Sequence, residues 1–301
     1  MQRLASVLLS SLLSASLYAT MAYGLAVIYG VMRIINLAHA GLMMLAAYVT
    51  LSLNTRFGLD PFVSLVVVTP LFFALGVLLD VTLIRRLPRG GATPSMQSLL
   101  LLFGLWLVLQ NLAYVIWSGD TQSILTSYTM RSVSLLGDSY GVPLLLVFAV
   151  SVLSLVALNV VLRRSYLGKA IRAVTQNRDA ALLSGVNADR ISAVAFGLGT
   201  AFAAIAGTMM STLYAFTPDF GRSFLLKAFC IIVLGGLESF TGVAVGALVL
   251  ALIENLVSAY TPIPTSFQDA ISFSLLVLVL VAAPNGLPEF VRGFSRRAVP
   301  R

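Results

Sequence analysis

The sequence predicts an all-α polytopic membrane protein with about eight or nine transmembrane or re-entrant helices. Hydrophobic residues occupy 59% of its 301 positions and charged residues only 10%, whereas a soluble domain carries about 25% charged residues. The apolar residues form continuous runs rather than the alternating pattern of a β-barrel. No linker or low-complexity block divides these runs, so we expect one membrane domain over residues 1–301.

Nine apolar runs are long enough, or nearly long enough, to cross about 30 Å of hydrocarbon as helices. The first, residues 4–29, exceeds the apolar core of a signal peptide and is followed by more apolar sequence, so we expect it to be retained. Two others, residues 37–53 and 224–237, are short and rich in small residues, and either could cross or re-enter the membrane. The remaining candidates are residues 62–84, 97–117, 142–162, 191–214, 243–260 and 270–283.

The placement of charge orients these spans. Of the 19 Lys and Arg residues, 13 lie in three clusters that flank predicted spans. The clusters consist of Arg85, Arg86 and Arg89, of the segment 163–190, and of Arg292, Arg296, Arg297 and Arg301. The loop 118–140 carries Asp120 and Asp138 against Arg131 alone. By the positive-inside rule, the clusters and the C-terminus are cytoplasmic and this loop is external.

Charge and composition also exclude several classes of function. A net charge of +8 is also typical of nucleic-acid-binding proteins, but the cations here lie beside spans, where they set topology. We therefore expect the lipid bilayer, and no nucleic acid, as a partner. Cys230 and His39 are the single cysteine and the single histidine. This excludes a disulfide, a zinc cluster and Cys–His chemistry within one chain.

The segment 163–190 interrupts the apolar sequence with six basic residues and two acidic ones. Within it, Asn177 is a good N-cap and Gly185 suits the C′ position of a helix of about two turns. The apolar residues 180–183 would form a patch on this helix, and Asn187 would cap the next one. A helix this short is unstable alone, so we expect it to dock in a groove of this protein or of another one.

A second feature is the stretch 29–41, which places polar groups between apolar runs. Arg33, Asn36 and His39 follow at i, i+3 and i+6, so they form one stripe if the chain is helical there. Polar groups at membrane depth are costly and usually face a protein interior or a water path, which favours a broken helix beside a translocation route. The alternative is an interfacial turn between two ordinary spans, with Asn36 capping the second.

A third feature is the glycine-rich stretch 234–246. Gly242-x3-Gly246 places two glycines on one helical face and permits tight packing. Lys227 and Glu254 lie inside predicted spans and need partners if they are buried. A structural ion pair or a snorkelling position at the interface is favoured, and a proton relay is the alternative. Glycine-interrupted segments in two halves of a chain indicate a transporter's central pathway. The candidates for that pathway are Arg33, Asn36, His39, Gly41, Gly235 and Gly236.

These segments resemble a known family. Asp179-Ala180-Ala181-x-x-x-Gly185 is similar to the E-A-A-x-x-x-G signature in the cytoplasmic loop of ABC-importer permeases, with Asp in place of Glu. Residues 29–48, 167–190 and 227–247 resemble, in the same order, segments of LivH-type permeases of branched-chain amino acid importers. The A-P-N-G-L at residues 283–287 resembles that family's R-P-x-G-L ending, with Ala replacing Arg.

The resemblance implies a permease subunit of an ATP-driven importer in the bacterial or archaeal cytoplasmic membrane. Its implied partners are a LivM-type second permease, two cytosolic ATP-binding subunits and an external substrate-binding protein. Its implied substrates are Leu, Ile and Val, although related permeases move urea, short amides and other amino acids. This chain has no G-x-x-x-x-G-K-[ST] phosphate loop, so ATP and Mg²⁺ are expected on the partners and no cofactor is expected here. The residues implied to couple to the ATPase are Asn177, Arg178, Asp179, Ala180, Ala181, Leu182, Leu183 and Gly185.

Two other classes of function remain open from the sequence. An ATP-independent carrier or channel for small polar solutes would depend on Glu254, Lys227 or His39. A membrane enzyme is disfavoured, because the sequence shows no nucleophile–base pair or metal cluster.

Overall fold

The computed structural model describes residues 2–86, 96–135, 137–236 and 239–261, together with residues 267, 270, 273–275, 277, 278 and 281. Arg89, Glu238, most of the predicted span 270–283, the residues 283–287 and the basic C-terminal cluster lie outside them. The elements in chain order are α1 (Gln2–Met32), α2 (Ala38–Phe57), α3 (Pro61–Thr82), η1 (Ile84–Arg86), α4 (Met96–Trp117), β1 (Ser132–Leu135), β2 (Asp138–Gly141), α5 (Val142–Arg164), α6 (Tyr166–Gln176), α7 (Arg178–Leu183), α8 (Ala188–Leu213), α9 (Gly221–Gly235) and α10 (Phe240–Tyr260).

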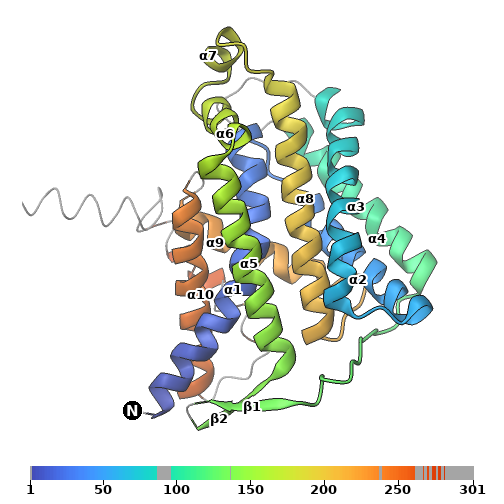
Figure 1. Ribbon diagram of the computed structural model, residues 1–301, viewed down its shortest axis with the longest axis vertical. Helices are drawn as coiled ribbons and strands as arrows, with labels where there is room; N and C mark the ends of the chain where they lie inside the picture. The colour runs from blue at the N-terminus through green and yellow to red at the C-terminus, as the bar shows by residue number, and fades with distance from the viewer. Residues whose placement is uncertain are drawn as a thin grey trace, which may run out of the picture.

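The protein is an all-α membrane protein, as predicted, built around α8 (Figure 1). α8 packs against α1, α2 and α3, and its small residues allow the helices to approach closely. A Cβ on Gly207 would lie 2.0 Å from the carbonyl oxygen of Met43 in α2, and one on Gly199 would lie 2.6 Å from the carbonyl oxygen of Gly24 in α1. Close backbone approach of this kind is how helices associate in a bilayer.

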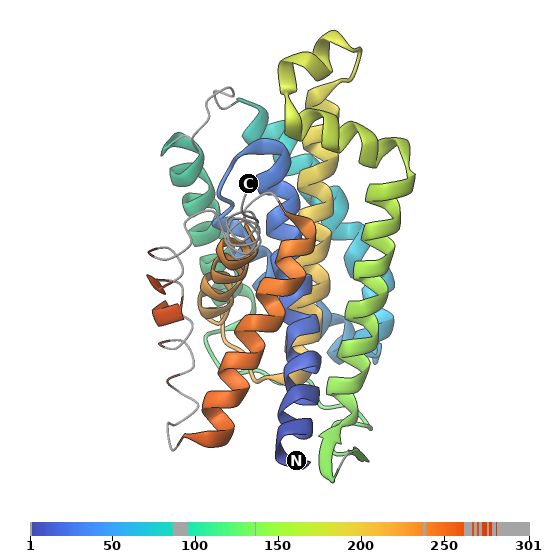
Figure 2. The same cartoon turned by 90° about the vertical axis from the view of Figure 1, so that its left-hand side faces the viewer.

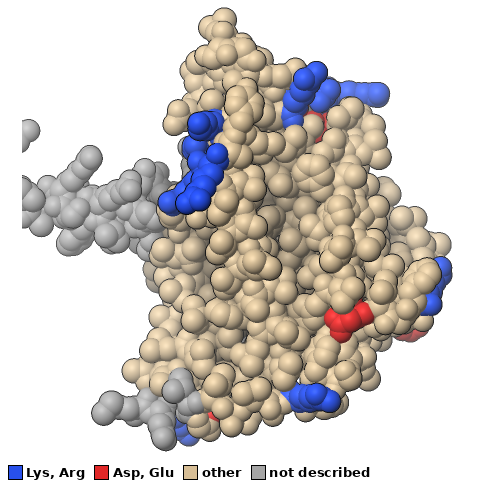
Figure 3. Space-filling view, viewed as in Figure 1, with Lys and Arg blue, Asp and Glu red and all other residues tan. Residues whose placement is uncertain are grey.

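Six described helices are long and apolar enough to cross a membrane, namely α1, α3 (continuing through η1), α4, α5, α8 and α10. α2, with 20 residues, and α9, with 15, are not among them, so the predicted total of eight or nine crossings is not confirmed. α3, α4 and α5 expose apolar side chains such as Val66, Val115 and Leu153. The middle of the face in Figure 3 is almost wholly uncharged, and its Lys and Arg side chains gather mainly at one end. An uncharged, apolar girdle is the surface that lipid requires.

The two ends of the bundle carry different structures. α7 projects from the end where the basic side chains gather, and the N-terminus and the β1–β2 hairpin lie at the other end (Figures 1, 2 and 3). The hairpin falls within the loop predicted to be external, but the sequence analysis did not predict it. Gly137 at its turn has φ +93°, which favours glycine. Tyr128 in the same loop donates to Asp60 Oδ2 (2.6 Å), which ties the loop to the start of α3.

The stretch 29–41 contains a break in the helix. α1 ends at Met32, residues 33–37 are not helical, and Arg33 has φ +55°. Arg33, Asn36 and His39 therefore form no helical stripe. The alternative with Asn36 as a cap is also wrong: the N-cap of α2 is Leu37, without a side-chain hydrogen bond. The chain does break between two helices, and the N–H of His39 bonds to the Asn36 backbone oxygen (3.3 Å). A place for this break beside a translocation route stays a prediction.

Candidate functional site

The segment 163–190 leaves the bundle by a sharp turn at Ser165. Its Oγ accepts the N–H of Gly168 (3.1 Å) and caps α6. A Cβ on Gly168 would lie 2.1 Å from the carbonyl oxygen of Leu162, so the chain can return this closely only at a glycine. Arg172 of α6 donates to the same carbonyl oxygen. These contacts hold α6 across the end of α5.

The predicted caps of α7 are confirmed. Asn177 Oδ1 accepts the N–H of Ala180 (3.0 Å), and Gly185 has φ +84°. The N–H of Gly185 bonds to the oxygen of Leu182, and the N–H of Val186 to the oxygen of Ala181, each at 3.0 Å. This pair of bonds is a Schellman motif, which ends a helix with a left-handed residue at C′. The predicted cap of the next helix is confirmed too, because Asn187 Oδ1 accepts the N–H of Arg190 (3.0 Å).

The apolar patch of α7 divides between this protein and its surroundings. Ala181 is buried against α6 and α8, whereas Leu183 is 91% exposed and Leu182 is also exposed. Arg178 holds the helix to α8 through an ion pair with Asp189 (2.6 Å). The groove in this chain thus accounts for one face of α7, which lies at the tip of the molecule (Figure 1), and Leu183 of this helix is exposed.

The structure brings two separately predicted features together. A hollow of about 220 Å³ is lined by residues 30–33 at the end of α1, by residues 174–178 where α6 meets α7, and by Ser192 of α8. Arg33 at the helix break and Asn177 at the cap of α7 therefore face the same space. α6 packs against both α1 and α7, so it links α7 to the broken end of α1.

At the break and just after it, two polar side chains are fully buried with unsatisfied atoms. Neither amide atom of Asn36 has a hydrogen-bond partner among the described residues. His39 Nε2 lies 3.0 Å from the carbonyl oxygen of Met21, and since a carbonyl only accepts, Nε2 is the protonated nitrogen. His39 Nδ1 has no partner. Buried polar groups are nearly always hydrogen-bonded, so we expect a polar group or a water molecule to bind to these atoms.

Lys227 and Glu254 form an ion pair, with Lys227 Nζ 3.1 Å from Glu254 Oε1. Tyr18 of α1 joins them: its hydroxyl donates to Glu254 Oε2 (2.6 Å) and accepts from Lys227 Nζ (3.3 Å). All three side chains are buried. The two charged residues were candidates from the sequence, but Tyr18 was not. Only its hydroxyl distinguishes it from the apolar residues around it.

Two of the candidate pathway glycines, Gly41 and Gly235, have close packing contacts. A Cβ on Gly242 would lie 1.7 Å from the carbonyl oxygen of Gly235, and one on Gly246 would lie 2.5 Å from that of Ile231, so these glycines join α9 to α10. Gly41 packs against Trp106 of α4. Gly236 follows α9 with φ +83°. Their part in a translocation path stays a prediction.

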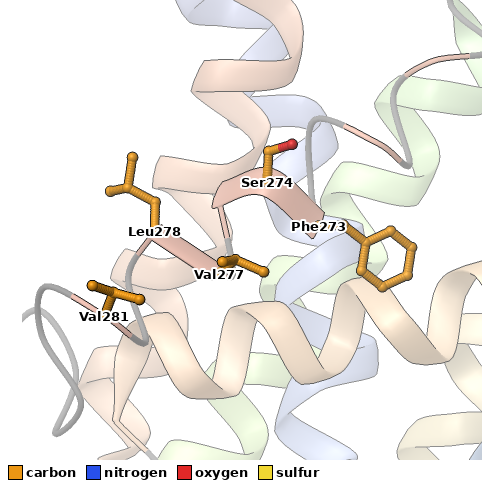
Figure 4. Close-up of a pocket in the computed structure, with 5 residues that line it drawn as sticks. All are labelled: Phe273, Ser274, Val277, Leu278 and Val281. Atoms are coloured by element: carbon orange, nitrogen blue, oxygen red, sulfur yellow. The ribbon is translucent and has the colours of Figure 1, made fainter.

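A second hollow, of about 660 Å³, lies at the surface near residues 273–281 (Figure 4). Phe273, Val277, Leu278 and Val281 line it together with Ser274, and the four apolar side chains are exposed. An apolar surface of this kind suits lipid or another helix. It offers little to a charged solute.

Comparisons with known proteins give a consistent result. The family model for the branched-chain amino acid transport system / permease component matches residues 7–280. The high-affinity branched-chain amino acid transport system permease protein LivH of Escherichia coli K12 is 30% identical over 290 residues, which cover 90% of this chain and 91% of the relative. The permease protein BraD of Pseudomonas aeruginosa is 29% identical over 296 residues, covering 93% and 94%.

A more distant similarity covers about half of the chain. The xylose transport system permease protein XylH of Haemophilus influenzae is 33% identical over 160 residues, which cover 50% of this chain and 41% of the relative. No solved structure matches. The family model spans most of the chain and the amino acid permeases match it nearly end to end, so this multi-pass membrane protein belongs to the branched-chain amino acid transport system permease family.

Proposed function

We propose that this chain is a membrane-spanning subunit of an ATP-driven importer that translocates branched-chain or closely related small amino acids. The observation that carries the proposal is the family match over residues 7–280, because membership of this family implies an ABC importer. The geometry supports it: a short, doubly capped helix projects from the basic end of an apolar bundle, with Leu183 exposed at its tip.

In this proposal α7 is the coupling helix. Closure of two ATP-binding subunits would press on Leu183 and its neighbours. The short α7 is fixed to α8 by the ion pair of Arg178 with Asp189 and packs against α6, which contacts α1. A push on α7 would therefore reach α1 and α8, which pack against each other through much of the bundle. Their relative tilt would open the path first to one side of the membrane and then to the other.

The remaining subunits follow from the same proposal. A second permease of LivM type would complete the path, and an external binding protein would deliver the substrate at the hairpin end. ATP and Mg²⁺ would bind to the ATPase subunits, since this chain has no phosphate loop. The α7 end and the C-terminus would face the cytosol of a bacterium or archaeon, as the basic clusters require.

The test is purification of the tagged chain in mild detergent from cells that make the whole complex, with mass spectrometry of the proteins that co-purify. We expect ATP-binding subunits to be recovered with the wild-type chain and to be lost from a Leu183→Ser variant. Leu125→Ser is the matched control, because Leu125 is also exposed but lies in the external loop. Recovery of the chain alone, still moving amino acids in liposomes without ATP, would overturn the proposal in favour of a carrier that uses Lys227 and Glu254.

A further inference from the structure

We propose that Lys227, Glu254 and Tyr18 form a binding site for the zwitterionic head group of an α-amino acid within the membrane-spanning part of the protein. This inference rests on the proposed import of amino acids and assigns the residues that contact the substrate. The three residues come from α9, α10 and α1, and α9 and α10 lie side by side in Figure 2.

The three side chains make a closed ring of contacts. Lys227 Nζ reaches Glu254 Oε1 at 3.1 Å and the Tyr18 oxygen at 3.3 Å, and the Tyr18 hydroxyl donates to Glu254 Oε2 at 2.6 Å. Lys227 is 6% exposed and Glu254 is 3% exposed. Lys227 lies six residues after the start of α9 and Glu254 six residues before the end of α10, so each is about 9 Å inside its helix.

Stability alone does not require this ring. Removing two charges from water is expensive, and replacing a buried ion pair by well-packed apolar side chains is often neutral or stabilising. Ionisable groups inside a membrane therefore indicate function by default. An amino acid that crosses the membrane carries an ammonium and a carboxylate of its own, and these need opposite charges within the protein for the same reason. Lys227 supplies the positive charge and Glu254 supplies the negative one.

The groups next to the ring favour the same ligand. Met21 lies one turn along α1 from Tyr18, and its carbonyl oxygen binds His39. His39 Nδ1 is buried without a partner and can accept a hydrogen bond from an ammonium. Gly221, the first residue of α9, is packed against Ala40 in the first turn of α2. The N-termini of α2 and α9 thus meet inside the protein, about 9 Å along α9 from Lys227, and helix N-termini favour a carboxylate.

Binding would proceed by exchange of partners. The substrate carboxylate binds the Lys227 ammonium and the Tyr18 hydroxyl, while the substrate ammonium binds the Glu254 carboxylate. Every charge keeps an opposite charge throughout, and the ring closes again when the substrate leaves. Ile231 and Leu250 lie one turn from Lys227 and Glu254 on their helices and belong to the buried core, which suits an apolar substrate side chain.

The test uses the complete reconstituted importer with one and the same binding protein, so that selection by that protein is constant. The Lys227→Met and Glu254→Gln double variant removes both charges and leaves neither partner buried alone. We expect it to assemble and to keep ATP hydrolysis stimulated by the loaded binding protein within about twofold, while leucine uptake falls more than about tenfold. Wild-type uptake by this variant would overturn the inference, and so would a parallel loss of stimulated hydrolysis, which would assign the pair to coupling or assembly.

Tyr18→Phe provides a second measurement if the double variant fails to assemble. This substitution removes the hydroxyl and keeps the aromatic side chain that packs against Lys227. We expect the concentration for half-maximal leucine uptake to rise several-fold with unchanged assembly. Unchanged uptake by Tyr18→Phe would overturn the inference. The proposed function fails separately, in the wild-type complex, if that complex hydrolyses ATP without importing leucine, isoleucine or valine.

Discussion

Replacing Gly185 with valine tests whether the cap of α7 matters for transport. Gly185 has φ +84°, and no atom lies within 4 Å of the position that a Cβ would take, so the substitution acts through the backbone conformation and not through a clash. A left-handed conformation costs a residue other than glycine about 1–2 kcal/mol, and a β-branched residue stands at the upper end. About 2 kcal/mol corresponds to a roughly 30-fold change in an equilibrium constant.

α7 cannot absorb this strain, because it has six residues and an isolated helix of that length is unstable. Relaxing the backbone at position 185 would also break the two bonds of the Schellman motif, from Gly185 and Val186. We therefore expect the capped conformation of α7 to be depopulated by about an order of magnitude or more. Uptake per ATP hydrolysed should fall in reconstituted complexes, while the apolar bundle stays folded.

Two variants make the result interpretable. Gly58→Val introduces a comparable strain at φ +64°, again with no atom within 4 Å of the Cβ position, but at the C-terminal end of α2, on the side predicted to be external; it should leave coupling intact. Gly185→Asn should retain most of the activity, because Asn tolerates the left-handed conformation. Normal uptake by a well-folded Gly185→Val protein would refute the assignment of α7 as the coupling helix.

Two further predictions concern stability. Gly242→Ala should lower the melting temperature, since its Cβ would lie 1.7 Å from the oxygen of Gly235 and overpacking costs about 1–3 kcal/mol. The control is Gly104→Ala, which has no neighbour within 4 Å and should be neutral or stabilising by up to about 1 kcal/mol. Equal melting temperatures of the Gly242→Ala and Gly104→Ala proteins would contradict the packing of α9 on α10. Asp60→Ala removes the cap of α3 and the acceptor of the Tyr128 hydroxyl, at a cost of about 2 kcal/mol. Protease should then cut the external loop faster, and an unchanged cleavage rate would count against this contact.

Local chemistry made the caps of α7 and α8 predictable from the sequence. Asn177, Gly185 and Asn187 act through hydrogen bonds and backbone angles within a few residues. The long apolar spans were predictable for a similar reason, since length and composition decide whether a helix can cross a bilayer. None of these features depends on what the distant parts of the chain do.

The features that were missed from the sequence, or left open by it, depend on contacts between distant residues. Tyr18 donates a hydrogen bond to Glu254, 236 positions away, and no local sequence pattern predicts that bond. Lys227 pairs with Glu254 between α9 and α10, which also pack closely at Gly235 and Gly242, and this packing is a property of the assembled bundle. The break after α1 places Arg33 at φ +55°, a conformation that surrounding structure must impose on a residue other than glycine.

The most direct test of the proposed function is uptake of labelled leucine into liposomes that contain the purified complex and the binding protein. We expect uptake to require ATP and to fall in the Gly185→Val complex, while the Gly58→Val complex transports normally. Uptake of the same size without ATP, or ATP-dependent uptake indifferent to position 185, would contradict the coupling of ATP hydrolysis to transport through α7.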